Sequence, residues 1–190
     1  IPVIADSAGE TISKLHPSIV VDARMAKTPL DTTMAAAPFV VGLGPGLVAG
    51  EHCHAVVETN RGHDLGRVIW SGPAQPDTGR PEPVLGFEAE RVLRAPASGV
   101  LRAQKQIGDT IQYGETVATV EGQPIIAPFI GILRGLLYDG LTVTANEKVG
   151  DLDPRLERRY CFTLSDKALA VGGGVAEAVM TWLQQYHVFL

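Results

Sequence analysis

The sequence predicts an α/β domain that is interrupted by a small all-β module. Short apolar runs of strand length alternate with turns over the first part of the chain, an internal repeat covers residues 95–153, and an amphipathic helical stripe closes the chain. A terminal helix of this kind needs a sheet to cover, which places the repeat between two parts of one domain. We therefore expect an α/β domain from residues 1–80 plus 154–190, and a β module from residues 84–153.

Three apolar runs in the first part, residues 19–21, 39–41 and 54–57, have the length of buried strands. Short helices are expected at residues 9–15 and 30–37, because a proline follows each of them closely. The first five residues, IPVIA, also have the composition of a strand. Since the chain starts at Ile1 without a methionine, we expect the start of a longer protein to be missing.

The repeat is the most specific pattern in the sequence. After a Pro-rich linker or exposed loop at residues 71–83, residues 95–121 align without gaps with residues 127–153, and nine of the 27 pairs are identical. Random pairing at typical residue frequencies gives about two identities, so the pattern indicates an internal duplication. Each copy has the pattern strand, Gly turn, strand, and two such copies are expected to complete a barrel or sandwich with quasi-twofold symmetry.

The end of the chain is predicted to be helical. Ser165 and Asp166 cap a short segment, and the run Gly172-Gly173-Gly174 is expected to break the helix. A phosphate site at the following helix N-terminus is the less favoured interpretation of the three glycines. The helical stripe after the break consists of Val175, Val179, Trp182, Leu183 and Tyr186.

Composition excludes several classes of protein. The 16 Lys and Arg against 21 Asp and Glu give a net charge of -5, without the basic stripe typical of nucleic-acid binding. No apolar run approaches the roughly 18 residues of a membrane span, so a cytoplasmic protein that does not bind membranes is expected. Cys53 and Cys161 lie far apart and form no CxxC motif, so neither a metal site nor a disulfide framework is predicted.

The charged segment after the third apolar run is the first candidate site. Asn60, Arg61, His63, Asp64 and Arg67 follow a buried strand end, where open α/β sheets bind ligands. The two arginines are suited to clamping an oxyanion such as phosphate, and the histidine and aspartate to acting as a general base and its orienting group. The alternative is a solvated loop whose charges pair with one another.

Two further candidates follow the other strand ends. Gly42, Gly44 and Gly46 lie in a Gly-rich turn whose backbone N–H groups can face an anion. A plain strand-ending turn is equally compatible, because the spacing departs from the dinucleotide-binding fingerprint. Asp22 is expected at the same edge of the sheet. There its carboxylate either binds a ribose hydroxyl or a metal ion, or has a capping role.

The sequence His52-Cys53-His54 favours a buried cysteine between two partly exposed histidines, because neighbouring residues of a strand point to opposite faces. A thiol that handles sulfur or selenium is the alternative, and it requires a lowered pKa at Cys53.

The repeat resembles the biotinyl/lipoyl-type (hammerhead) β module. The segments APASGVL and APFIGIL are each followed by a Gly-containing turn and an apolar strand, as in that family. The resemblance places the family's modified lysine in the hairpin at residues 121–124, whose sequence here is EGQP. No lysine occurs between Lys105 and Lys148, so we expect no covalently bound biotin or lipoate.

Longer motifs resemble the YqeB-type accessory proteins of selenium-dependent molybdenum hydroxylases. These motifs are VVDARMAK, VGLGPGLVAG, HAVVETNRGHDLGRVIW, IAPFIGILRGLLYDGL and SDKALAVGGGVAEAV. The resemblance implies a factor that matures or serves such a hydroxylase and that has an upstream nucleotide-binding-like half. The α/β domain is then the later part of a three-layer, Rossmann-like domain whose N-terminal half is missing. The resemblance supplies no catalytic residues.

Two functions of different classes follow. The first is an accessory protein that binds the molybdenum cofactor or another anionic cofactor, the apo-hydroxylase, or other maturation proteins, and assists insertion of sulfur, selenium or the cofactor. The alternative is a free-standing nucleotide-dependent enzyme, an oxidoreductase or transferase, in which the β module is a lid or an oligomerisation platform. Whether the chain is an enzyme stays open at this point, and a homo-oligomer is compatible with both functions.

Overall fold

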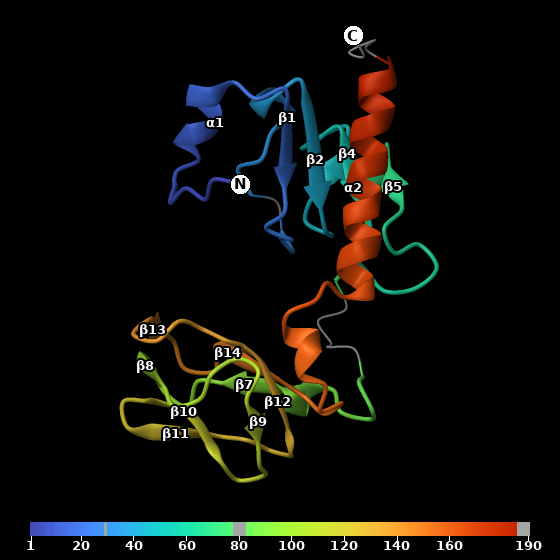
Figure 1. Ribbon diagram of the computed structural model, residues 1–190. Helices are drawn as coiled ribbons and strands as arrows, with labels where there is room; N and C mark the ends of the chain where they lie inside the picture. Colours follow the sequence, from blue (N-terminus) through green and yellow to red (C-terminus); the bar gives the residue numbers. More distant parts are fainter. Residues whose placement is uncertain (29, 78–82, 186–190) are drawn as a thin grey trace. The chain divides into compact units, whose positions relative to one another are not determined.

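The computed structural model describes residues 1–28, 30–77 and 83–185, and the chain forms two compact units (Figure 1). The first unit consists of Ile1–Thr78 with Ser165–Leu190, and the second of Gly79–Leu164. The first combines helices with a mixed sheet, and the second is almost entirely β, so the chain has the expected α/β character.

The first unit is built on a four-stranded sheet with the order β1-β2-β4-β5. The strands β1 (Ile19–Asp22), β2 (Phe39–Leu43) and β4 (Ala55–Val57) are parallel, whereas β5 (Val68–Ile69) is antiparallel to β4. The three strands expected in this part are therefore confirmed. Every residue of β2 and β4 is buried, as is typical of strands that are covered on both faces.

The other elements before the second unit are short: α1 (Glu10–Leu15), η1 (Met34–Ala36), β3 (Val48–Ala49) and β6 (Gly72–Pro73). The helix expected at residues 30–37 is only the single 3₁₀ turn η1, because Asp31 and Thr32 bind Arg24 instead of continuing a helix. The first five residues form no strand, so that expectation is wrong. Part of the Pro-rich segment, residues 78–82, lies outside the described residues.

The helix α2 (Asp166–Gln185) covers one face of this sheet, as the sequence predicts (Figure 1). Its buried residues Val171, Ala178 and Trp182 pack against β2 and β4, and the rings of Trp182 and Phe39 stack at 5.3 Å between centroids. The other face is covered by a second apolar cluster of loop and strand residues, which includes Leu47, Ala49 and Cys53.

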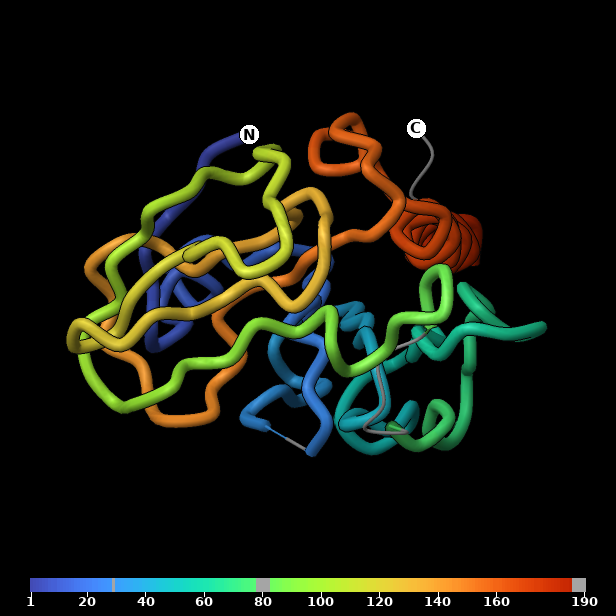
Figure 2. Tube along the Cα trace, turned by 90° about the horizontal axis from the view of Figure 1, so that it is seen from below, coloured from blue at the N-terminus to red at the C-terminus, as the bar shows by residue number. Residues whose placement is uncertain are grey.

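The run Gly172-Gly173-Gly174 does not break α2, so that prediction is wrong. A Cβ atom at Gly174 would lie 2.1 Å from the carbonyl oxygen of Gly66, and one at Gly66 would lie 2.5 Å from the carbonyl oxygen of Ala170. Glycine therefore permits helix and loop to approach closely here. Figure 2 shows α2 end-on with the β4–β5 loop beside it. Tyr186 of the predicted stripe lies outside the described residues.

The second unit consists of two four-stranded sheets with a shared apolar core between them (Figure 1). One sheet has the order β11-β10-β8-β13 and the other β7-β14-β12-β9. The strands are β7 (Val92–Arg94), β8 (Gly99–Ala103), β9 (Thr110–Ile111), β10 (Thr116–Val120), β11 (Gln123–Ile126), β12 (Gly131–Leu136), β13 (Thr142–Val143) and β14 (Lys148–Asp153). The 3₁₀ turn η2 (Ala89–Arg91) precedes β7.

The hydrogen bonds of the second unit repeat with the same 32-residue shift as the sequence. The pair Thr116↔Ile126 of one sheet corresponds to Lys148↔Arg94 of the other, and a register shift follows each pair. The N–H of Gly114 donates to Ala127 O, and that of Asn146 donates to Ala95 O, at 2.9 Å in both halves. The duplication inferred from nine identities is thus present as quasi-twofold symmetry of the backbone.

Residues 154–164 belong to the second unit, whereas the sequence analysis placed them in the α/β domain. The 3₁₀ turn η3 (Arg158–Cys161) packs on β12, and Arg158 Nε donates to Gly108 O at 3.2 Å. Arg155 is held by the buried carboxylate of Asp153 at the end of β14, with Nη2 2.5 Å from Oδ2. These side-chain contacts, which periodicity does not reveal, keep the segment on the β module.

Gly174→Ala is expected to lower the free energy of unfolding of the first unit by about 2 kcal/mol or more, because the methyl group overlaps the Gly66 carbonyl. Urea unfolding followed by tryptophan fluorescence measures this change, since Trp70 and Trp182 both lie in the first unit. The matched control is Gly173→Ala, where nothing lies within 4 Å of the added atom and the helix gains up to about 1 kcal/mol. Equal effects of the two substitutions would contradict the close contact.

Candidate functional site

The parallel strands of the first unit bring the sequence-predicted site residues to one edge of the sheet. β1 ends at Asp22, β2 leads into the turn at Gly44, and β4 leads into Glu58. Because β2 lies between β1 and β4 and all three run parallel, these strand ends share the carboxyl edge. Ligands of open α/β sheets bind at this edge, so it is the candidate site.

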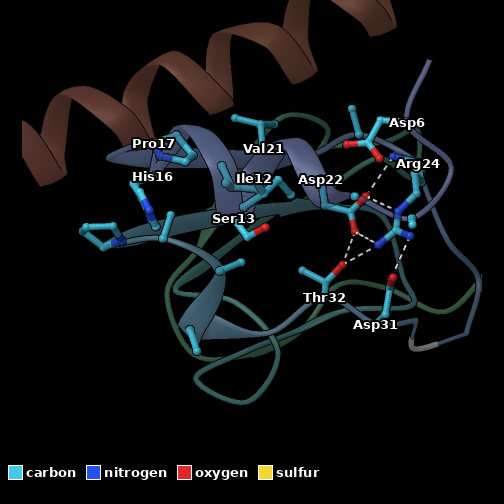
Figure 3. A pocket seen from close by; sticks show the side chains of 18 of the residues that line it. Asp6, Ile12, Ser13, His16, Pro17, Val21, Asp22, Arg24, Asp31 and Thr32 are labelled. Atoms are coloured by element: carbon cyan, nitrogen blue, oxygen red, sulfur yellow. Dashed lines mark hydrogen bonds and ion pairs between the residues drawn. The ribbon is translucent and has the colours of Figure 1, made fainter. Parts of the chain in front are cut away.

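Asp22 is buried and forms the centre of a side-chain cluster with Arg24, Asp31 and Thr32 (Figure 3). The Arg24 guanidinium donates from Nε to Asp22 Oδ1 at 3.0 Å and from Nη2 to Oδ2 at 2.8 Å. The hydroxyl of Thr32 donates to the same Oδ2, and Arg24 Nη1 donates to Asp31 Oδ1 at 2.7 Å. Asp22 Oδ1 also accepts from the backbone N–H of Arg24 at 3.0 Å, in line with the capping role that the sequence analysis gave as an alternative. In addition, Asp22 orients the Arg24 guanidinium, a role not expected from the sequence.

The electrostatics of this cluster favour both charged forms. The hydrogen bonds from Arg24 outweigh the effect of burial and lower the pKa of Asp22 to about 2. In return, Asp22 and Asp31 raise the pKa of Arg24 above its ordinary value. The Arg24 side chain is 51% exposed, and its outer partner Asp31 is 79% exposed, so a ligand can reach the guanidinium from the side of Asp31.

A cavity of about 1200 Å³ lies beside β1, and the cluster stands at one end of it (Figure 3). Apolar side chains of Ile12, Val20 and Val21 line it together with alanines 35–37. Its polar side chains outside the cluster are Asp6, Ser7, Ser13 and His16. The volume is somewhat larger than the roughly 300–1,000 Å³ of most small-molecule sites. The cavity lies beside α1, a helix that buries none of its residues. No sequence motif marks such a gap in packing, so the cavity could not be predicted.

The Gly-rich turn uses its donors within the chain. The N–H of Gly46 donates to Ala26 O at 2.8 Å, and that of Gly44 donates to Val57 O at 3.4 Å. A Cβ atom at Gly46 would lie 2.6 Å from the same Ala26 oxygen. The close approach of this backbone explains the glycine without an anion.

The charged loop between β4 and β5 has partners both within the loop and outside it. Arg61 binds Asp166 at the start of α2 through two bonds, of 2.5 Å from Nη1 and 3.0 Å from Nη2, and holds the pKa of that carboxyl well below its ordinary range. Arg67 Nε lies 2.8 Å from Asp64 Oδ1. Asn60 Nδ2 donates to Gln75 Oε1 at 2.8 Å. Of these contacts, the pair Arg67–Asp64 lies within the loop, as the alternative in the sequence analysis expected, whereas Arg61 and Asn60 bind residues outside the loop.

The expected base and orienting group are not hydrogen-bonded to each other among the described residues. His63 is exposed, and the partners of Asp64 are Arg67 and the Gln75 amide, which lies 3.4 Å from Oδ2. The arrangement therefore lacks the orienting contact that a general base uses, although such contacts can tighten when a substrate binds.

Glu58 is a residue that the sequence analysis missed as a structural centre. Its side chain is buried, Oε1 accepts from the N–H of Asn60 at 2.7 Å, and Oε2 accepts from the N–H of Gln75 at 2.7 Å. The carboxylate thus ties the charged loop to the segment after β6. The available signal was a glutamate placed directly after a fully apolar strand, where a buried charge needs donors.

Cys53 is fully buried, and burial raises the pKa of its thiol to about 11. His54 Nδ1 accepts from the N–H of Val40 at 3.0 Å, and His52 Nδ1 accepts from that of Val48 at 3.1 Å. The interpretation as a buried cysteine between two partly exposed histidines is confirmed. Within the described ranges, no group of three or more His, Cys, Asp or Glu side chains is arranged to hold a metal ion.

No family model matches the chain, whereas a curated protein does. Over 185 residues, or 97% of its length, the chain is 48% identical to the uncharacterized protein YqeB of Escherichia coli K12. The YqeB-type resemblance is confirmed. The chain spans about a third of the length of that curated relative, 34% of which is matched.

Similarity to solved structures is weak. An aspartoacylase family protein of Mesorhizobium loti is 19% identical with a TM-score of 0.31, over 34% of this chain and 23% of that one. A succinylglutamate desuccinylase/aspartoacylase of Rhodobacter sphaeroides is 22% identical with a TM-score of 0.28, over 45% and 30%. Scores this low carry no argument about fold or function. Among the described helices, none is long and apolar enough to cross a bilayer.

Asp22→Asn is expected to lower the free energy of unfolding of the first unit at neutral pH by about 2 kcal/mol, the equivalent of a pKa lowered from 3.8 to about 2. Because the folded-state pKa is the lower one, this contribution is fully present above pH 3.8 and is lost as the pH falls toward 2. Tryptophan-monitored urea unfolding of both proteins across this range is the test.

The control is Asp31→Asn, whose carboxylate is 79% exposed and is expected to contribute less than about 0.5 kcal/mol. A difference between wild type and Asp22→Asn that persists unchanged to pH 2 would show that the charge of Asp22 is not what stabilises the cluster.

Proposed function

We propose that this chain is part of an accessory protein that serves a selenium-dependent molybdenum hydroxylase. In this proposal it binds the apo-enzyme or an anionic cofactor while molybdenum cofactor, sulfur or selenium is inserted. The support for the system is the likeness to YqeB over 97% of the chain, together with the long motifs that carry the resemblance. Because the chain spans about a third of that relative, the whole protein's activity belongs to the proposal.

The observation that carries a binding role is the cavity beside β1, with the Arg24 guanidinium fixed at one end. The Arg24 guanidinium is held by Asp22 on one side and paired with the exposed Asp31 on the other. Together with the apolar wall, it suits a ligand that has a flat or apolar body and an anionic group that takes the place of Asp31. Both the molybdenum cofactor and a nucleotide have this chemistry, so the nucleotide-dependent enzyme remains the competing outcome of the test.

Covalent transfer through Cys53 is less well supported than binding. A thiol whose pKa is raised to about 11 is almost entirely protonated near neutral pH, and the protonated form is a poor nucleophile. The hairpin at Glu121 and Gly122 also has no amine, and Glu121 Oε1 accepts from the N–H of Val100 at 3.0 Å. We therefore infer non-covalent binding as the act that this chain performs.

Deleting the gene in a host with a selenium-dependent molybdenum hydroxylase is expected to leave that hydroxylase inactive and short of selenium or molybdenum. The readouts are its activity and its content of both elements. Complementation with full-length Arg24→Gln is expected to restore little activity, because the fixed cation is lost, and Arg61→Ala and Asp64→Ala test the charged loop in the same assay.

The control for complementation is Arg102→Gln, an exposed arginine of the second unit. It is expected to restore activity as well as wild type does. Full hydroxylase activity with both elements present in the deletion strain would refute the maturation role and favour the nucleotide-dependent enzyme.

Cys53 is expected to resist alkylation by iodoacetamide at neutral pH in the folded protein and to react after denaturation, because its thiol is buried and protonated. Peptide mass spectrometry separates it from Cys161, which is only partly buried. Rapid labelling of Cys53 in the folded chain would reopen the thiol route.

A further inference from the structure

The turn at residues 155–162 carries a local charge opposite to that of the whole chain. Its sequence, RLERRYCF, has three arginines and one glutamate, whereas the chain has a net charge of -5. We call residues 155–162 the basic turn; it contains η3 and belongs to the second unit. Neither the sequence motifs nor the proposed function uses it.

Aromatic rings hold the arginines of the basic turn. The Arg158 guanidinium lies 5.2 Å from the ring centroid of Phe162, and those of Arg155 and Arg159 lie 4.5 and 5.1 Å from that of Tyr160. Stacking on a ring face satisfies the flat face of a guanidinium and leaves the N–H groups at its rim available.

Two of these arginines have donors that the described residues do not use. Arg158 Nε donates to the Gly108 carbonyl, and no carboxylate of the described chain pairs with this guanidinium. Arg159 has only Glu157, with Nε 3.5 Å from Oε2, and its side chain is 68% exposed. By contrast, Arg155 is bound to the buried carboxylate of Asp153. The basic turn thus presents two cations to solvent.

Exposed apolar side chains lie within and next to the same turn. Phe162 is 61% exposed and Leu164 is 72% exposed, and Leu156 within the turn is 48% exposed. The edge of the Phe162 ring lies over Gly108, beside which Ile107 is also exposed. A surface that combines guanidinium groups whose N–H donors are not all used with large apolar side chains has the composition of a protein-binding surface.

Contacts with the rest of the second unit and within the segment hold the basic turn in one conformation. Cys161 Sγ contacts Leu133 O at 3.7 Å, Thr163 Oγ1 donates to Arg159 O at 3.0 Å, and Arg158 is tied to Gly108. A preformed turn of this kind orders few residues on binding, which reduces the entropy lost.

We propose that the basic turn is a docking surface for an acidic segment of a partner protein, in which Asp or Glu residues are interspersed with large apolar residues. The carboxylates bind Arg158 and Arg159, and the apolar side chains pack on Phe162 and Leu164. Charge complementarity selects the acidic partner. Nucleic acid fits less well, because the chain is acidic overall and the apolar half of the surface would face a phosphate backbone. The inference does not depend on the hydroxylase, since it rests on contacts of the second unit.

The test uses the purified full chain and a fluorescent peptide in which Asp and Glu alternate with Leu and Phe, with binding followed by anisotropy. The double variant Arg158→Gln/Arg159→Gln is expected to bind at least about tenfold more weakly than wild type. Phe162→Ser is expected to weaken binding as well, and to do so equally at low and high salt, because it removes an apolar contact. The matched control is Arg102→Gln, an exposed arginine on strand β8 of the same unit, which is expected to change affinity less than twofold.

Three outcomes would overturn the proposal. One is that Arg102→Gln weakens peptide binding as much as the double variant does, which would indicate that any exposed arginine attracts the peptide. Another is equal binding of a polyglutamate peptide without apolar residues, and the third is competition by inorganic phosphate or single-stranded RNA at concentrations below that of the peptide. Circular dichroism of each variant checks that the β module is folded, and its failure to fold would move the test to Arg159→Gln alone. None of these results depends on whether the gene deletion affects a hydroxylase.

Discussion

The close backbone contact between Gly66 and Gly174 is the constraint on which the first unit depends. It joins two stretches of chain that are separated by the whole second unit, and it sets the distance of α2 from the sheet. With α2 at this distance, Trp182 near the end of the helix stacks on Phe39, and Asp166 at the start of the helix binds Arg61. A larger side chain at either glycine would push α2 away from the β4–β5 loop and weaken the packing of the helix on the sheet.

Buried carboxylates organise both units in the same way. Glu58, Asp22 and Asp153 each lie at or directly after the end of a strand, and each is surrounded by N–H donors from residues close in sequence. A buried carboxylate without such donors would be strongly destabilising, so these residues fix the loops that satisfy them. The same bonds use up charges that a sequence pattern presents as available for a ligand.

Much of the fold could be predicted because it depends on periodicity and repetition. Strand-length apolar runs located β1, β2 and β4, and nine identities at one shift located the quasi-twofold unit. The candidate site was predictable only in part. Topology brought Asp22, Gly44 and Glu58 to one edge as expected, but which charges pair is decided by three-dimensional neighbours such as Asp166 and Gln75. The helix break predicted at the three glycines was wrong for the same reason. Helix propensity is a local property, whereas the contact with Gly66 joins residues far apart in the sequence.

The strand order of the second unit shows that neither copy of the repeat forms a complete sheet alone. The strands β7 and β11 lead into the first and the second copy of the repeat. Counted with those copies, each sheet takes two strands from one copy and two from the other: β8 and β10 pair with β13 and β11, while β12 and β14 pair with β9 and β7. One copy alone therefore has half of each sheet and no closed core. A single copy could complete both sheets only by pairing with a second copy, and in this chain the hairpin at Glu121 and Gly122 joins the two copies covalently.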